Sequence, residues 1–342
     1  MKKLQNTLYI LTPGSTLSLG NEALVVAVGG EEKLRVPAHG IESILCFGNT
    51  TVTTPLIQFC GERGIALSWF SENGRFYGRT AGPVHGNILL RRQQFKALED
   101  GKWQSAIVRS VLVGKLVNSR ETLLRGARET DSVEAKERLK AAAEGIGRLG
   151  ERMEEQSDVD SLRGLEGVAA KLYFDVFPLM IKAKDPAMSF HGRTHRPPED
   201  PVNALLSYLY TLLKNDVQSA LEGVGLDPAC GYLHTLRPGR PALALDVMEE
   251  LRSPLCDRLA LTLLNRGQIN GKSFEKPGSP YHLTDAARKT VITAWQKRKQ
   301  ETIQHPFLDE RVPIGLIPHC QSMLLARVLR GELDVYPPFH WR

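Results

Sequence analysis

The chain has 342 residues, of which 42% are hydrophobic and 24% are charged, and its formal net charge is +6 at pH 7. These values predict a folded globular protein with room for two domains, and they exclude a chain that is disordered throughout. Because no run of about twenty apolar residues is present and residues 1–7 lack the apolar core of a signal peptide, we expect a cytoplasmic protein with no membrane partner.

Residues 1–82 have the pattern of a small β-rich domain. Short segments rich in β-branched and aromatic residues are separated by Gly, Asn and Pro, which are typical of turns. The predicted strands cover residues 7–11, 16–19, 23–28, 33–37, 44–47, 65–70 and 76–79. One helix is predicted among them, with Thr54 as its cap, Pro55 at its first position and Gly64 at its end.

After a predicted linker at residues 83–90, the apolar spacing becomes helical and stays helical over residues 91–342. Residues 128–158 are rich in Ala, Glu, Lys and Arg and poor in large apolar side chains, as in a solvent-exposed helical hairpin. Three prolines within residues 197–201 precede a further helix that begins at Val202. The sequence therefore predicts an α+β protein, in which a small N-terminal β-rich domain is followed by a larger all-α C-terminal domain.

The most informative motif of the second domain contains two carboxylates one helical turn apart. Asp246 and Glu249 would project from one face of a helix, where their mutual repulsion favours a cation between them. His234 precedes this helix by a turn-rich connection, and Glu166 lies beside the apolar face of an earlier helix, where an unpaired carboxylate is costly. Nitrogen and carboxylate ligands without a thiolate suit Mg²⁺ or Mn²⁺ better than a structural zinc ion.

Simpler interpretations of these residues remain open. Asp246 and Glu249 could form a solvated first turn, since carboxylates there interact favourably with the helix dipole, and His234 could be an ordinary half-buried histidine. His191 and His195 have zincin-like spacing, but the glycine and prolines around them indicate a loop. Five scattered cysteines with no CxxC pair argue against a disulfide framework or a zinc knuckle, and they predict reduced, mostly buried thiols.

The excess of basic residues favours a polyanionic partner such as double-stranded DNA. Basic side chains gather in three places, which are a loop at residues 193–196, the turn that follows His234, and the segment 288–299. We predict phosphate contacts from Arg193, Arg196, Arg237, Arg252, Lys297 and Arg298. For each of them, a solvated charge or an ordinary ion pair on a helix surface remains an alternative.

The order of motifs along nearly the whole chain resembles that of a known protein family. The motifs are Phe47-Gly48 to Leu67, the triplet Asn73, Gly74 and Arg75, residues 162–167, residues 200–206, His234, residues 245–252, and Tyr336-Pro337-Pro338-Phe339. Several are weak singly, but the ordered set is specific. The chain is similar to CRISPR-associated protein one, the integrase that inserts captured DNA fragments as new spacers into a CRISPR array. Its opening residues and compact length resemble the type I-C branch of that family.

This resemblance implies a metal-dependent DNA endonuclease and integrase, which joins the 3′-hydroxyls of a DNA fragment to the CRISPR repeat by transesterification. It implies that Mg²⁺ or Mn²⁺ is held by Glu166, His234 and Glu249, with Asp246 beside the ion as a supporting carboxylate. These four are the candidate catalytic residues. Many relatives carry aspartate at the position of Glu249, so the longer side chain is expected to shift the ion slightly.

The resemblance also implies partners. Family members form homodimers through the β domain, and two dimers flank a dimer of a small ferredoxin-like adaptation subunit on double-stranded DNA. Some systems add an iron-sulfur exonuclease. Two other functions remain open for this sequence, namely a non-catalytic DNA-binding scaffold and a metallo-phosphoesterase for small molecules. The sequence contains no Walker lysine loop, dinucleotide glycine fingerprint or serine nucleophile elbow.

Overall fold

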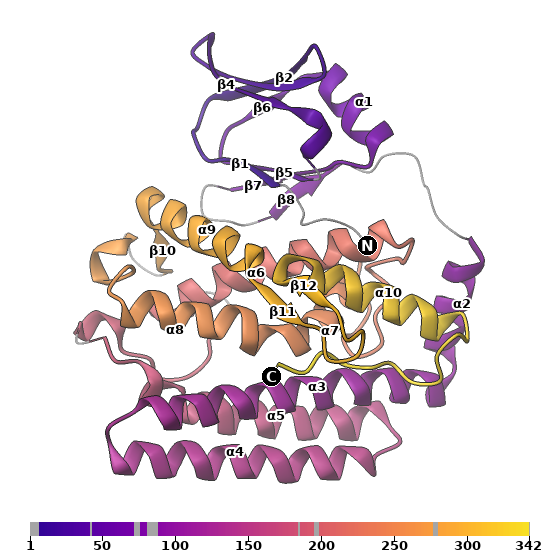
Figure 1. Cartoon of the computed structure of the whole chain (residues 1–342), viewed down its shortest axis with the longest axis vertical. Coiled ribbons are helices and arrows are strands. Elements are labelled where there is room, and N and C mark those ends of the chain that lie inside the picture. The colour runs from indigo at the N-terminus through magenta and orange to yellow at the C-terminus, as the bar shows by residue number, and fades with distance from the viewer. Residues whose placement is uncertain are drawn as a thin grey trace. The chain divides into compact units, whose positions relative to one another are not determined.

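The computed structural model describes residues 7–41, 43–71, 76–80, 88–183, 185–194, 198–275 and 280–341. The chain divides into two compact units, Met1–His85 and Gly86–Arg342 (Figure 1). The predictions for residues 73–75, for residues 83–87 of the linker, and for His195 and Arg196 lie outside the described residues.

The first unit is built from two four-stranded sheets. Its strands are β1 (Thr7–Ile10), β2 (Ser15–Gly20), β3 (Ala23–Val28), β4 (Glu31–Pro37), β5 (Ser43–Phe47), β6 (Thr51–Val52), β7 (Ala66–Phe70) and β8 (Phe76–Arg79). One sheet has the order β1–β5–β7–β8, with β8 antiparallel to its neighbour and the other pairs parallel. The other sheet has the order β4–β3–β2–β6. All seven predicted strands are present, and the two residues of β6 were missed because they are too few to show an alternating pattern.

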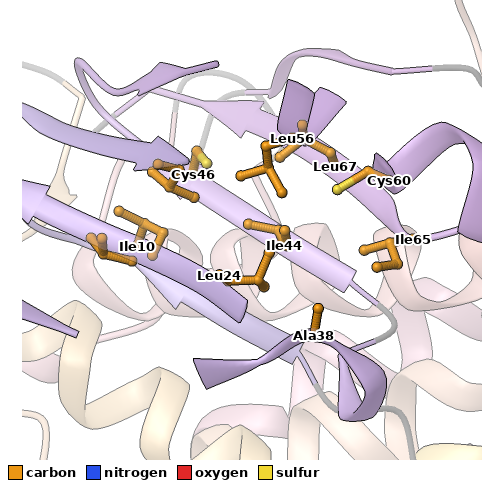
Figure 2. Packing of buried hydrophobic residues seen from close by; sticks show 11 residues of the cluster. Ile10, Leu24, Ala38, Ile44, Cys46, Leu56, Cys60, Ile65 and Leu67 are labelled. Atoms are coloured by element: carbon orange, nitrogen blue, oxygen red, sulfur yellow. The ribbon is translucent and has the colours of Figure 1, made fainter. Parts of the chain in front are cut away.

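The core of this unit takes side chains from both sheets and from α1 (Thr54–Arg63), as Figure 2 shows. Leu17, Ile44, Leu56 and Leu67 are completely buried there. Gly64 ends α1 with a left-handed φ of +66°, which agrees with the predicted role of this glycine. The predicted cap is wrong by one residue. Thr53 occupies the N-cap position and Thr54 is already helical, because a proline is tolerated at either of the first two helical positions.

The second unit is mainly helical. Its α-helices are α2 (Ile88–Glu99), α3 (Gly101–Glu129), α4 (Val133–Glu154), α5 (Val159–Val176), α6 (Pro201–Gly223), α7 (Ala242–Leu251), α8 (Arg258–Asn265), α9 (Asp285–Gln300) and α10 (Ile317–Leu329). A π-helical turn, η4 (Arg252–Asp257), joins α7 to α8. Because α2 begins at Ile88, the described part of the predicted linker already belongs to a helix.

The prediction that this unit is all-α is wrong. It contains two short antiparallel pairs, β9 (Phe274–Glu275) with β10 (His282–Leu283), and β11 (Thr302–Gln304) with β12 (Arg311–Pro313). Strands of two or three residues pair the backbone groups of connections between helices, and they leave no periodicity for a sequence to reveal. Within the described residues, no helix is long and apolar enough to cross a membrane.

Helices α3, α4 and α5 pack side by side in the second unit (Figure 1). The predicted hairpin at residues 128–158 is instead the end of α3, a short turn and the single helix α4. One face of α4 is buried against its neighbours through Leu139, Ala143 and Ile146, so this helix is not solvated on all sides. Three of its seven buried residues are alanines, which helps to explain why its apolar content was underestimated from the sequence.

Candidate metal centre

Helix α7 carries the two predicted carboxylates, and both are buried. The exposed fraction is 2% for Asp246 and 3% for Glu249. The alternative of a solvated first turn is therefore wrong, because ionised groups at this depth must be paired or hydrogen-bonded.

Asp246 holds the short loop that carries His234. Its Oδ2 accepts the backbone N–H groups of Tyr232 at 2.5 Å and Leu233 at 3.0 Å, and its Oδ1 accepts the N–H of His234 at 3.0 Å. The same Oδ1 lies 2.7 Å from Nδ1 of the His234 ring. A carboxylate that already accepts three N–H groups is an acceptor here as well, so Nδ1 carries the proton and a neutral ring keeps its lone pair on Nε2.

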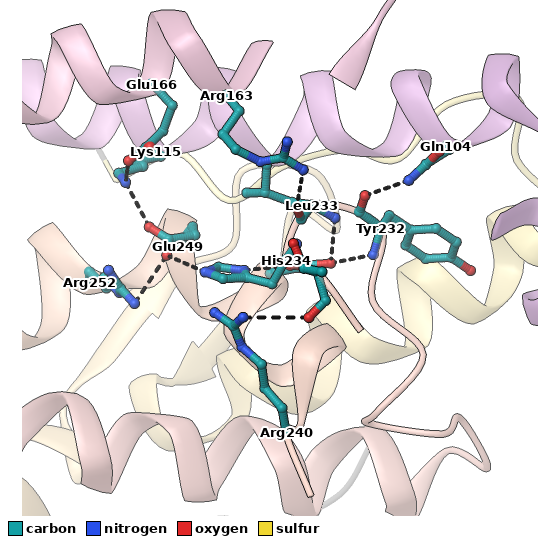
Figure 3. Close-up of polar contacts among 12 residues, drawn as sticks. Gln104, Lys115, Arg163, Glu166, Tyr232, Leu233, His234, Arg240, Glu249 and Arg252 are labelled. Carbon is teal, nitrogen blue, oxygen red and sulfur yellow. Dashed lines mark hydrogen bonds and ion pairs between the residues drawn. The ribbon is translucent and has the colours of Figure 1, made fainter. Parts of the chain in front are cut away.

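Two further side chains fix the carbonyl groups of this loop. Arg163 on α5 donates from Nη2 to the Leu233 carbonyl at 2.8 Å, and Gln104 on α3 donates to the Tyr232 carbonyl at 2.8 Å (Figure 3). The loop is thus tied to three helices, which holds His234 in one orientation over α7.

Glu249 lies at the centre of the cluster. Its Oε2 is 2.7 Å from Lys115 Nζ, and its Oε1 is 3.0 Å from Arg252 Nη2 and 3.9 Å from His234 Nε2 (Figure 3). Burial alone would raise the pKa of Glu249, but the positive charges beside it, Arg252 first and then Lys115, outweigh burial and lower this pKa to about 2. The carboxylate therefore stays ionised at any physiological pH.

Lys115 on α3 connects Glu249 to Glu166 on α5. Its ammonium forms ion pairs with both carboxylates (Figure 3). Burial lowers the pKa of Lys115, but Glu249 and Glu166 raise it by more, so the net pKa lies above the ordinary lysine value. The sequence predicted that Glu166 needs a partner, and that partner is the Lys115 ammonium from another helix.

Lys115 was not singled out from the sequence, although a signal for it exists. It continues the spacing of Val108, Val111 and Leu112, which are all buried on α3. A lysine inside the apolar stripe of a helix requires an anionic partner.

The divalent ion that the resemblance implies would take its ligands from this cluster. Among the residues described, no group of three or more His, Cys, Asp or Glu side chains is arranged to hold a metal ion. The reason is that the Lys115 ammonium stands between the two carboxylates and Arg252 engages one oxygen of Glu249. The donor chemistry still fits, since two carboxylates share a cation and His234 Nε2 lies 3.9 Å from one of them. Asp246 is not counted among the ligands, because both of its oxygens accept hydrogen bonds from the loop at residues 232–234.

Two of the predicted DNA contacts lie beside this cluster. Both Arg252 and Arg193 stand over the ring of Tyr210, at 4.9 and 5.2 Å from its centroid. Arg193 also donates to Asn203 Oδ1 at 2.6 Å and Ser207 Oγ at 3.1 Å, and burial lowers its pKa. Each guanidinium is therefore held in a fixed direction.

The other predicted DNA contacts have different surroundings. Arg237 and Lys297 are exposed. Arg298 pairs with Glu301 at 2.5 Å and lies 4.9 Å from the centroid of the Trp341 ring. DNA contact by these three residues stays a prediction. Lys299, which belongs to the same basic segment, is buried and pairs with an aspartate of α6, so part of that segment's charge serves packing.

Residues 336–341 pack behind α7 and reach the carboxylate next to Glu249. Glu250 is completely buried, and it accepts hydrogen bonds from Tyr336 Oη at 2.6 Å and the Phe339 N–H at 2.8 Å. Asn118 on α3 donates to the carbonyls of Glu250 and Phe339, both at 2.7 Å, and accepts the N–H of Trp341 at 2.7 Å. These contacts fix α7 against α3, which carries Lys115.

The cysteines take no part in this cluster. All five are free and buried, as the sequence predicted. Burial raises the pKa of Cys46 to about 11 and that of Cys230 to about 12, so these thiols are not poised as ligands.

Comparison with known proteins identifies a consistent set of relatives. The family model described as CRISPR associated protein Cas1 matches residues 8–297. The protein named CRISPR-associated endonuclease Cas1 1 of Moorella thermoacetica is 48% identical over 343 residues, which cover 100% of both chains. The protein of the same name from Chlorobaculum tepidum is 47% identical over 343 residues, again with 100% of each chain covered.

Two solved structures share the fold. A chain of a Cas6-RT-Cas1–Cas2 complex has a TM-score of 0.84 and 23% identity, with 100% of this chain and 36% of that chain covered. A casposase bound to its integration product has a TM-score of 0.83 and 18% identity, with 99% of this chain and 95% of that chain covered. At these identities the likeness concerns the fold alone.

Proposed function

Because the chain belongs to the Cas1 family of CRISPR-associated proteins, we propose that it is a metal-dependent DNA endonuclease and integrase of CRISPR adaptation. In this role it joins the 3′-hydroxyls of a DNA fragment to the phosphodiester backbone of the CRISPR repeat by transesterification, which acquires a new spacer. The named endonuclease relatives support the enzyme class, and the casposase with its integration product supports the integration chemistry.

One observation carries the proposal. Glu166, His234 and Glu249 come from α5, a loop and α7, and they meet at Glu249, which shares the Lys115 ammonium with Glu166 and lies 3.9 Å from His234 Nε2. Burial of so many charges costs free energy of desolvation. Lys115 and Arg252 pair with the buried carboxylate of Glu249, and His234 is held in one orientation beside it. The scaffold alternative requires carboxylates that are surface decoration, and the burial of Glu249 disfavours it.

Each residue has a distinct part in the proposed reaction. Glu166 and Glu249 supply carboxylate ligands and His234 supplies Nε2, while Asp246 keeps the ring in the orientation that frees this atom. When bound there, Mg²⁺ or Mn²⁺ would neutralise phosphoryl charge and lower the pKa of the attacking hydroxyl. Arg252 is placed to contact the scissile phosphate, since its guanidinium is directed at Glu249 and held over Tyr210.

The two carboxylates cannot bind a divalent ion and Lys115 at the same position. With a divalent ion held there, the ammonium would turn away from Glu166 and Glu249, which its flexible four-carbon stem allows, and the nearest new anions would be phosphates of the bound DNA. Lys115 would thus hold the two carboxylates together in the metal-free protein and contact phosphate in the metal-bound one.

The proposed assembly follows the same family. We expect a homodimer that acts with a small ferredoxin-like adaptation subunit on double-stranded DNA, and the solved complex that contains Cas1 together with Cas2 supports this partner. An iron-sulfur exonuclease is an additional expected partner in systems that trim DNA ends. Basic residues of this chain that remain exposed, such as Arg237, are candidates for the DNA path.

The test is a strand-transfer assay. A labelled short duplex with free 3′-hydroxyls is mixed with a repeat-bearing plasmid, Mn²⁺, the adaptation subunit, and either wild type or Glu249→Ala. Covalent transfer by wild type that disappears in the variant supports both the reaction and the site. Glu137→Ala, at an exposed position on α4, is the matched control and should transfer like wild type. Equal transfer by Glu249→Ala would refute the site, and tight DNA binding with no transfer by wild type would favour the scaffold.

A further inference from the structure

A completely buried glutamine on α2 contacts the loop that carries His234. The buried residues of this helix are Leu90, Gln94 and Ala97, whose spacing places them on one face, and Gln94 is the polar one among them. Its exposed fraction is 0%, so its amide needs hydrogen-bond partners inside the protein. The proposed reaction gives this side chain no part, and its burial therefore calls for another explanation.

The partners of Gln94 are backbone groups at the start of that loop. Its Oε1 accepts the N–H of Asp227 at 2.9 Å, and its Nε2 donates to the Asp227 carbonyl at 2.8 Å and to the Cys230 carbonyl at 3.2 Å. The amide thus pairs with both the donor and the acceptor of one residue, as a neighbouring β-strand would. A carboxylate lacks the donors and an apolar side chain lacks both groups, so this pairing requires a carboxamide.

The same loop also packs against the first turn of α7. Pro241, the N-cap residue of this helix, has no polar side-chain atom, and the Pro228 carbonyl accepts the N–H of Leu243 at 2.8 Å. Gly231 approaches the helix so closely that a Cβ at its position would lie 2.6 Å from the carbonyl carbon of Ala242. The loop therefore has little freedom to slide along α7.

A single residue separates the two attachments of this loop. The last group that Gln94 binds is the Cys230 carbonyl, and the first group that Asp246 binds is the N–H of Tyr232. Gly231 lies between them and is itself held against α7. In addition, the Tyr232 hydroxyl donates to the backbone carbonyl of Gln94 at 3.2 Å. Because the chain has no slack here, a displacement of the start of the loop passes to its end, where the candidate ligand lies.

On the premise of the proposed metal centre, we infer that Gln94 is a positioning residue for His234. Gln94 fixes the first half of the loop and Asp246 fixes the second half. Together they set where Nε2 of the ring lies relative to Glu249, from which it is 3.9 Å away. Without the Gln94 amide, Asp246 still sets the tautomer of the ring, but the ring occupies a wider range of positions and binds the ion less tightly.

Hydrogen exchange of the whole metal-free chain, read by mass spectrometry, tests this inference without DNA or metal. In Gln94→Met, which keeps an unbranched side chain, the amides of residues 232–234 should exchange about fivefold faster than in wild type, although their own partner Asp246 is unchanged. Leu139→Ala, at a buried position on α4, is the control for general loss of stability and should leave these amides as in wild type. Exchange of residues 232–234 that is unchanged in Gln94→Met, or that quickens equally in Leu139→Ala, would overturn the inference.

Manganese binding provides the second measurement. The electron paramagnetic resonance signal of free Mn²⁺ gives the dissociation constant, which Gln94→Met should raise about tenfold, the lower end of the effect of losing a support of a ligand. Tyr232→Phe removes only the hydroxyl bond to α2, so it should fold like wild type and raise the dissociation constant about threefold. A dissociation constant unchanged in both variants would overturn the role of Gln94 and leave the metal centre intact. Wild type that binds no Mn²⁺ would refute the metal centre itself.

Discussion

In the absence of divalent metal, replacement of Lys115 by methionine should lower the free energy of unfolding of the protein. The change removes the ammonium between Glu166 and Glu249 but keeps an unbranched apolar side chain. Breaking a buried ion pair costs about 3–5 kcal/mol when the remaining charge is uncompensated. Here Glu249 keeps Arg252 at 3.0 Å and Glu166 is partly exposed to water, so we expect a loss of about 2–3 kcal/mol in the free energy of unfolding. The melting temperature should fall by about 4–12 °C.

Divalent metal should raise the free energy of unfolding more in Lys115→Met than in wild type. In wild type an entering ion must displace the ammonium, whereas in Lys115→Met the carboxylates are free to bind it. A tenfold gain in metal affinity adds about 1.4 kcal/mol of stability at saturating metal. Thermal unfolding with and without Mn²⁺ measures both effects, and Lys140→Met, at an exposed position on α4, is the matched control. A metal-induced shift that is equal in wild type and Lys115→Met would refute the idea that the lysine and the ion share one position.

Three further predictions concern the surroundings of the centre. Asp246→Asn should lower Mn²⁺ affinity about 10- to 100-fold in a metal titration, because the amide no longer fixes the His234 tautomer, and unchanged affinity would contradict that role. Burial raises the pKa of Asp257 from 3.8 to about 6, with its tyrosine hydrogen bonds opposing this, so its stabilisation is complete below pH 3.8 and lost as the pH rises through about 6. From pH 5 to pH 8 the stability of wild type should therefore fall by about 1.4 kcal/mol more than that of Asp257→Asn, which thermal unfolding at the two pH values measures, and parallel profiles would argue against this titration. Asn118→Ala should cost about 2–4 kcal/mol, because buried backbone groups of Glu250 and Phe339 lose their partner, and limited proteolysis should then cleave within residues 336–341.

Much of this architecture could be predicted from local sequence patterns. The strands of the first unit and helix α7 follow from alternation, turn residues and helical spacing, and Glu166, His234 and Glu249 were singled out by their chemistry. The apolar stripe of α3 indicates that Lys115 needs an anionic partner, but no local pattern shows that its partners are two carboxylates 51 and 134 positions later in the chain. Lys299 was likewise counted only as part of the basic segment 288–299, since the aspartate that neutralises it lies on another helix.

The packing of residues 336–341 behind α7 has a consequence for biosynthesis. Glu250 precedes its hydrogen-bond donor Tyr336 by 86 residues. At a translation rate of about 5–20 residues per second, α7 leaves the ribosome about 4–17 s before that donor exists. During this interval Glu250 has no tyrosine to stabilise it in the interior, so we expect α7 to dock only after residues 336–341 have emerged. We therefore expect the proposed nuclease centre to assemble last, after residues 336–341 have reached Glu250.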